Sequence, residues 1–171
     1  MARRTRSLRE FQLSLGERLR SAATRSALSS RLGFQVGGES WFVALHQVSE
    51  VIPIPTIVSV PLTQPWFRGV ANIRGNLYSI IDFSAFQGRE AIGAGMEKRV
   101  ILISDRLIGG AGLVVSRMLG LRNPETFTAQ ERPAQAVPWL GGVYTAPGGT
   151  QWLELDLPAL VRQPEFVEVG Q

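Results

Sequence analysis

Residues 65–83 carry the pattern that most restricts the fold of this 171-residue chain. Two short apolar runs flank the polar unit Arg74-Gly75-Asn76. The branched and aromatic residues on both sides favour extended, half-buried backbone. Gly75 can adopt the positive φ that a tight reversal requires, and Asn76 tolerates it better than most residues. The segment therefore predicts a β-hairpin with Gly75 and Asn76 as its turn residues and Arg74 beside them.

The chain contains 18 glycines and 10 prolines, which separate many short runs of valine, isoleucine and leucine. Such punctuation favours an all-β fold over a helical bundle. A chain of this length buries about 70% of the surface that its unfolded form exposes. That is enough for one domain, or for two small lobes that share a core.

An amphipathic helix is predicted near the N-terminus, over residues 7–23, because four apolar residues recur near helical spacing. We expect this helix to dock its apolar stripe on the body of the protein. Residues 21–31 are small and polar, which predicts a linker between the helix and the body. The apolar residues of the stripe are Leu8, Phe11, Leu15 and Leu19.

Positive charge is concentrated in residues 1–31, which hold eight arginines and two glutamates and carry a net charge of +6, while the rest of the chain carries −2 of the total of +4. A basic arm can bind nucleic acid or an anionic membrane surface, and this is the alternative function. The body has no basic stripe and no interleaved aromatic and basic residues of the kind that stacked bases need. We therefore expect no nucleic-acid partner.

The sequence contains an internal repeat with an offset of 70 to 74 residues. Three segments return in the same order, which predicts two duplicated β units, each the size of a five-stranded barrel, packed together. The second copy lacks the Asn-x-Arg-Gly element of residues 72–75, and this asymmetry favours a binding role for Arg74. The matching segments are residues 45–51 with 115–121, 66–70 with 139–143, and 80–83 with 154–157.

Patterns for catalysis and metal binding are missing. The chain has no cysteine and one histidine, His46, and it shows neither a phosphate-binding glycine loop nor a GxSxG elbow. Asp82 and Asp156 could suggest the paired carboxylates of a glycosidase. Their equivalent positions in the repeat instead predict that they cap turns by accepting hydrogen bonds from backbone amides. We expect no enzymatic activity, no cofactor and no metal.

No apolar run approaches the 18 residues that a membrane-spanning helix needs. Polar and charged residues interrupt the N-terminal leucines, so the apolar centre of a signal peptide is also missing. The sequence predicts a cytoplasmic protein with no direct membrane insertion.

Residues 66–83 resemble the signature of the CheW family, the coupling proteins of bacterial chemotaxis. That signature contains Gly-Val-x-Asn-hydrophobic-Arg-Gly and then an alternating strand that ends in hydrophobic-Asp-hydrophobic. Here it reads Gly69-Val70-Ala71-Asn72-Ile73-Arg74-Gly75, followed by Ile81-Asp82-Phe83. The resemblance covers about residues 32–162. The arginine-rich N-terminal helix and the amino-acid sequence of residues 66–78 most resemble those of the PilI-type coupling proteins of type IV pilus (twitching motility) chemosensory systems.

The resemblance implies two packed five-stranded SH3-like β-barrel subdomains, intertwined in one CheW-like domain over residues 32–165, after an N-terminal helix and linker (residues 1–31) and before a tail (residues 166–171). It implies a non-catalytic adaptor that joins the cytoplasmic tip of a methyl-accepting chemoreceptor to the regulatory domain of a CheA-type histidine kinase. Such an adaptor is cytoplasmic and recruited to membrane-bound receptor arrays. By motif, the receptor-binding residues are Val48, Glu50, Gly69, Asn72 and Arg74.

Overall fold

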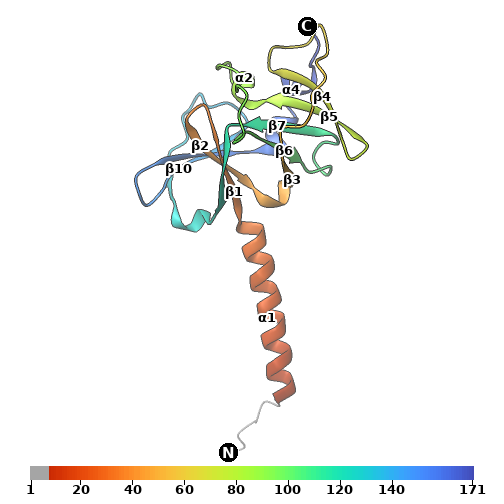
Figure 1. Cartoon of the computed structure of the whole chain (residues 1–171). Coiled ribbons are helices and arrows are strands. Elements are labelled where there is room, and N and C mark those ends of the chain that lie inside the picture. The colour runs from red at the N-terminus through yellow and green to blue at the C-terminus, as the bar shows by residue number, and fades with distance from the viewer. Residues whose placement is uncertain (1–7) are drawn as a thin grey trace, which may run out of the picture.

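The computed structural model of the protein describes the backbone of residues 8–171 and the side chains of residues 13–24 and 29–171 (Figure 1). The part of the predicted basic arm that precedes Leu8, together with the side chains of Leu8 and Phe11, lies outside this description. The described chain forms a β body from which one long helix projects (Figure 1).

The projecting helix is α1 (Leu8–Ser29), which differs from the sequence-based prediction in two ways. The predicted linker over residues 21–31 is wrong, because alanine, leucine and arginine in this stretch are good helix formers and the helix continues to Ser29. The predicted docking on the body is also wrong. Leu13, Leu15 and Leu19 are 69%, 47% and 63% exposed, and the helix points away from the sheets (Figure 1). The helix runs almost directly into the first strand, so no linker is left that could fold it back.

Two sheets form the body. The six-stranded sheet has the order β8-β1-β2-β11-β10-β9, and the five-stranded sheet has the order β3-β6-β7-β5-β4. The strands of the six-stranded sheet are β1 (Arg31–Val36), β2 (Glu39–Ala44), β8 (Arg117–Arg122), β9 (Thr128–Gln130), β10 (Leu140–Thr145) and β11 (Gln151–Leu155). Those of the five-stranded sheet are β3 (Val48–Pro53), β4 (Phe67–Ile73), β5 (Asn76–Asp82), β6 (Arg99–Ile103) and β7 (Ala111–Val115).

Short helices connect or follow the strands. They are η1 (Leu45–Gln47), α2 (Phe83–Phe86), η2 (Pro124–Thr126), α3 (Leu157–Val161) and α4 (Pro164–Val167). The predicted tail from residue 166 is packed rather than free, since Phe166 in α4 is buried and Gly170 pairs with Thr63. The phenylalanine gives this last segment an apolar side chain to bury, which anchors it.

The two sheets have the same internal order, which explains the repeat in the sequence. β3-β6-β7-β5-β4 corresponds to β8-β1-β2-β11-β10, and in each sheet the third and fourth strands of that order pair in parallel. With β9 left aside, each sheet takes two strands from one repeat and three from the other, so the two lobes are intertwined. The sequence predicted two lobes of five strands each; β9 adds a sixth strand to one sheet.

One hydrophobic core joins both sheets. At its centre the ring of Phe83, from α2, lies 5.4 Å from Trp41 and 5.5 Å from Trp139, both edge to face. Trp41 belongs to β2 in the six-stranded sheet, whereas Phe83 follows β5 in the five-stranded sheet. Edge-to-face aromatic pairs add about 0.5–1.5 kcal/mol beyond their buried area. The lobes are therefore held together by a shared aromatic cluster.

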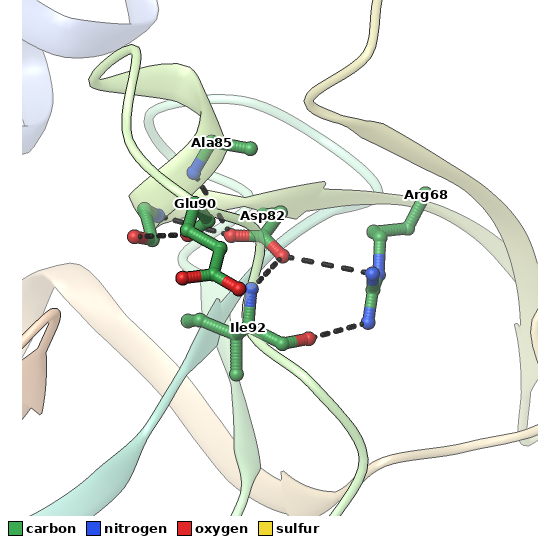
Figure 2. Close-up of polar contacts among 6 residues, drawn as sticks. Arg68, Asp82, Ala85, Glu90 and Ile92 are labelled. Carbon is green, nitrogen blue, oxygen red and sulfur yellow. Dashed lines mark hydrogen bonds and ion pairs between the residues drawn. The ribbon is translucent and has the colours of Figure 1, made fainter.

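Asp82 and Asp156 cap helices, as the repeat predicted. Asp82 is fully buried, and its Oδ1 accepts hydrogen bonds from the backbone N–H groups of Ser84 and Ala85 at 3.1 and 3.0 Å (Figure 2). Its Oδ2 accepts from the N–H of Ile92 at 2.8 Å. Asp156 Oδ1 accepts from the N–H of Ala159 at 2.9 Å. Both carboxylates thus satisfy amides that the first turn of a helix leaves free.

Arg68 completes the cluster around Asp82 (Figure 2). Its Nη1 lies 3.7 Å from Asp82 Oδ2, and its Nη2 donates to the carbonyl of Ile92 at 2.8 Å. Through these contacts the loop that follows α2 is tied to β4 on one side and to the end of β5 on the other. The contacts of the buried Asp82 carboxylate with three backbone N–H groups and with Arg68 all hold the fold together, so its role is structural.

Candidate functional site

The β4–β5 hairpin turns on two residues, Arg74 and Gly75. Both have positive φ, +54° and +87°, the requirement of a type I′ hairpin turn. Asn76 is already paired with Ile73 as the first residue of β5, so its predicted place in the turn is wrong. The positive φ falls on Arg74 instead because a two-residue loop leaves no position for Asn76. A non-glycine residue in this region of backbone space is uncommon and marks a constrained position.

Arg74 forms a bidentate ion pair with Glu50. Its Nη1 donates to Glu50 Oε2 at 2.6 Å, and its Nη2 donates to Oε1 at 2.7 Å. Glu50 lies on β3 and Arg74 directly follows the last residue of β4, and these two strands are the opposite edges of the five-stranded sheet. The sheet must therefore curl until its two edges approach each other at this end. Parallel N–H···O contacts between guanidinium and carboxylate hold this geometry.

The ion pair is displayed to solvent rather than buried. The side chains of Arg74 and Glu50 are 74% and 36% exposed. The hydrogen bond from Arg74 lowers the pKa of Glu50 below its ordinary value, and the same bond raises the pKa of Arg74. Arg74 uses two of its five N–H donors on Glu50, so the rest stay available to a partner.

Asn72 is exposed at the same end of the hairpin and supports its turn. Its side-chain Oδ1 accepts a hydrogen bond from the backbone N–H of Gly75 at 2.8 Å. The asparagine therefore fixes the loop that carries Arg74 while its amide nitrogen remains on the exposed surface. The structure brings Glu50, Asn72 and Arg74 together at one end of the sheet.

Val48 and Gly69, the other two residues named by the motif, lie differently. Val48 begins β3, is half-buried and packs on the core. Gly69 is buried, has φ of +128°, and a Cβ atom there would clash with the carbonyl oxygen of Val58. Only glycine fits beneath Val58 and Ser59, so Gly69 shapes the backbone next to the site and is not part of its exposed surface.

Two exposed apolar residues beside the site were missed by the sequence reading. Leu77 is 66% exposed and is the cross-strand partner of Asn72. Val58 is 62% exposed and pairs with Val70 along the outer edge of β4. Alternation along β5 could not have revealed that Leu77 is exposed, because Leu77 shares a side of the strand with the buried Ile81. We define the hairpin surface as Glu50, Asn72, Arg74 and Leu77.

The hairpin surface combines groups that are suited to recognition by another protein. Among the residues that the structure describes, no group of three or more histidine, cysteine, aspartate or glutamate side chains is arranged to hold a metal ion. Within the same part of the chain, no helix has the length and apolar character needed to cross a membrane. A charged pair beside an exposed leucine and an amide suits the contact with another protein.

Comparison with known proteins shows which family the chain belongs to. The family model described as "CheW-like domain" matches residues 31–165. A curated relative, Protein PilI of Pseudomonas aeruginosa, is 31% identical over 145 residues, covering 82% of this chain and 80% of the relative. The family match therefore includes both sheets and the whole hairpin surface.

Among solved structures, the scaffolding protein TtCheW from Thermoanaerobacter tengcongensis has the same fold. It superposes with a TM-score of 0.68 over 82% of this chain and 97% of the other, with 18% sequence identity. The all-β fold with two packed sheets and an N-terminal helix, expected from the resemblance, is confirmed.

Proposed function

We propose that this chain, which belongs to the CheW-like domain family, is a non-catalytic adaptor that couples a methyl-accepting chemoreceptor to a CheA-type histidine kinase in a chemosensory pathway controlling type IV pilus twitching motility. Proteins of this family are scaffolds for such signalling complexes. The relationship to Protein PilI supports the type IV pilus pathway in preference to flagellar chemotaxis.

The observation that carries the proposal is that the side chain of Arg74 is exposed to solvent and held in a fixed position. A turn with positive φ, a hydrogen bond from Gly75 to Asn72 and a bidentate pair with Glu50 all hold one exposed guanidinium in place. Such preorganisation reduces the side-chain entropy that binding would otherwise cost. We assign the hairpin surface to the cytoplasmic tip of the receptor, with Val48 and Gly69 shaping the backbone beneath it.

The receptor tip that fits this surface is helical and carries both polar and apolar groups. Leu77 offers an apolar contact, and the free donors of Arg74 can bond a carboxylate or a helix C-terminal carbonyl. Charge-assisted contacts of this kind set register and specificity more than affinity. In this proposal the regulatory domain of the kinase binds a face of the body other than the hairpin surface. The adaptor is cytoplasmic and reaches the membrane only through the receptor array.

Reconstitution tests the proposal. Purified kinase, receptor cytoplasmic fragments and this protein are combined, and kinase autophosphorylation is followed with and without the adaptor. We expect receptor state to change the phosphorylation rate only when the adaptor is present. A kinase that responds to the receptor equally well without the adaptor contradicts the proposal.

Exchange of the two charges separates recognition from folding. The double variant Glu50→Arg, Arg74→Glu keeps an ion pair on the same two strands but reverses its direction. If Arg74 only braced the sheet, the exchange would restore function lost in Arg74→Glu. We expect the exchanged protein to fold normally and still fail to bind receptor, while its binding to kinase persists.

A further inference from the structure

Helix α1 projects from the body and exposes apolar side chains that a helix ordinarily buries (Figure 1). Its 22 residues extend over about 33 Å at a rise of 1.5 Å per residue. Leu15 and Leu19 are 47% and 63% exposed, and Ala22 is exposed as well. A helix in a protein gains most of its stability by packing its apolar face, and Gly16 lowers the intrinsic stability of this helix. We therefore expect α1 to be stabilised by a partner.

The joint between α1 and the body restrains the direction of the helix. A single residue, Ser30, separates α1 from β1, and its carbonyl accepts a hydrogen bond from the backbone N–H of Leu45 at 3.1 Å. Arg31 Nη1 donates to the carbonyl of Ser29 at 3.1 Å, and Arg31 Nε donates to Glu154 Oε1 at 3.0 Å. The last turn of α1 is thus tied to the six-stranded sheet. A helix held in this way loses less entropy when a partner binds it.

The exposed apolar residues of α1 lie on one narrow stripe. Leu15, Leu19 and Ala22 follow one another at spacings of four and three residues, which return to the same side of a helix. This is the spacing of the seam between two helices in a coiled coil. A helix that lies on a membrane surface presents a broader apolar face, often with tryptophan, and α1 contains no tryptophan. We define the α1 seam as Leu15, Leu19 and Ala22, and its width fits one further helix.

Positive charges border the α1 seam. Arg18 and Arg20 are exposed and lie on the two sides of Leu19. Glu17 is two residues away from both Leu15 and Leu19, so it lies on the opposite side of the helix. Charges beside the seam of a coiled coil set the choice of partner. A second copy of this chain would bring arginines against arginines, whereas a helix with carboxylates beside its own seam would attract them.

We propose that α1 is a docking helix for an acidic amphipathic helix of another protein. The partner helix packs its apolar side chains on the α1 seam, and aspartates or glutamates beside them bond Arg18 and Arg20. The two helices form a short coiled coil that projects from the body. This interaction does not depend on the adaptor function, because no residue of the hairpin surface takes part in it.

A synthetic helical peptide of about four heptads, with leucine at positions a and d and glutamate at positions e and g, is the probe. Its control has the same leucines and lysine in place of glutamate, and like charges keep either peptide from pairing with itself. Isothermal titration calorimetry with the full chain measures both. We expect a Kd of about 10 µM or tighter for the acidic peptide and binding at least about tenfold weaker for the basic one. Amide hydrogen exchange in residues 13–24 should slow when the acidic peptide binds.

Two leucines of α1 give a matched pair of variants. Leu19→Ser removes an apolar side chain of the α1 seam, and we expect it to weaken binding of the acidic peptide by about tenfold. Leu13→Ser is the control, since Leu13 is 69% exposed on the same helix but lies two residues before Leu15 and so away from the seam. Both variants lower the helix propensity equally. We expect Leu13→Ser to change the affinity by less than about twofold.

Three results of these titrations would overturn the inference: no binding of the acidic peptide, equal affinity for the two peptides, or equal loss in Leu13→Ser and Leu19→Ser. Other occupants are tested by sedimentation of the full chain and by vesicles of phosphatidylcholine and phosphatidylglycerol. Dimerisation or vesicle binding that is stronger than peptide binding and is abolished by Leu19→Ser would assign the α1 seam to a second copy or to a membrane instead. Receptor and kinase are absent from these measurements, so their failure leaves the adaptor function untouched.

Discussion

Arg74 and Glu50 bond across the opening of a curled sheet, at 2.6 and 2.7 Å, although their strands are the two outer strands of that sheet. Ladder hydrogen bonds hold the other strand pairs together, but this pair of edges is joined at its end by side chains. Both side chains are among the five that the family motif predicts for receptor binding. The Arg74–Glu50 ion pair thus joins the two edges of the five-stranded sheet and also holds the exposed guanidinium of Arg74 in place.

Arg74→Glu is expected to weaken receptor binding by at least about tenfold, since it repels Glu50 and reverses the charge offered to the receptor. An exposed ion pair contributes little to folding, so the melting temperature should fall by less than about 4 °C. Pull-down with receptor fragments measures the first effect, and differential scanning calorimetry the second. Normal receptor binding by a well-folded Arg74→Glu protein would refute the assignment.

Titration of Glu50 should reveal the pair directly. Its pKa in the folded protein is lowered by the hydrogen bond from Arg74, so the pair stabilises the folded state at pH values above the unfolded pKa. This contribution is lost as pH falls through the folded pKa, which lies below the ordinary value of 4.5. Carbon-detected NMR of the Glu50 carboxyl group should give a midpoint below that value. In the Arg74→Ala variant the midpoint should rise, and an unchanged midpoint would show that the pair is not formed in solution.

Gly75→Val is expected to destabilise the fold by about 1–3 kcal/mol, because φ of +87° is unfavourable for a β-branched residue. A Cβ atom added to Gly75 would have no other atom within 4 Å, so the effect is conformational and not steric. Gly75→Asn is the matched control, since asparagine tolerates positive φ and should cost less. Urea denaturation measures both; equal stability of the two variants would contradict the turn geometry.

The β4–β5 hairpin shows which features of the candidate site can be predicted from the sequence and which cannot. Its two strands, the need for glycine at position 75 and the exposure of Arg74 followed from local patterns. The Arg74–Glu50 pair could not be predicted, because it depends on how far the sheet curls. Asn76 was misplaced because the length of the loop depends on strand register, which composition does not reveal.

The orientation of α1 shows a second limit of the same reasoning. Its apolar spacing correctly predicted a helix, but an amphipathic stripe indicates only that one face can be covered, not what covers it. By contrast, the caps at Asp82 and Asp156 were predictable, because equivalent positions in a repeat meet the same local need. The exchange of strands between the lobes could not be derived from the repeat alone.

The two capping aspartates provide a matched pair of variants. Asp82→Asn removes the charge from a fully buried carboxylate that accepts three backbone N–H bonds and lies 3.7 Å from Arg68. Asp156→Asn affects a carboxylate with one such bond, to Ala159. We expect a loss of about 2–4 kcal/mol for the first and about 1 kcal/mol for the second in urea denaturation. Similar losses would mean that the Asp82 cluster is no more than an ordinary helix cap.

Removal of residues 1–29 decides between the adaptor and a binder that acts through its arginine-rich arm. Among the residues that the structure describes, α1 contacts the body chiefly at η1 and its leucines are exposed, so the body should fold without it. The truncation keeps Arg31, whose Nε donates to Glu154 at 3.0 Å within the six-stranded sheet. We expect kinase and receptor binding to survive, with a melting temperature close to that of the full chain. The same protein and the full chain are then tested on vesicles containing anionic lipid and on duplex DNA. If all binding to receptor and kinase disappears with the helix, the arm and not the hairpin surface carries the function.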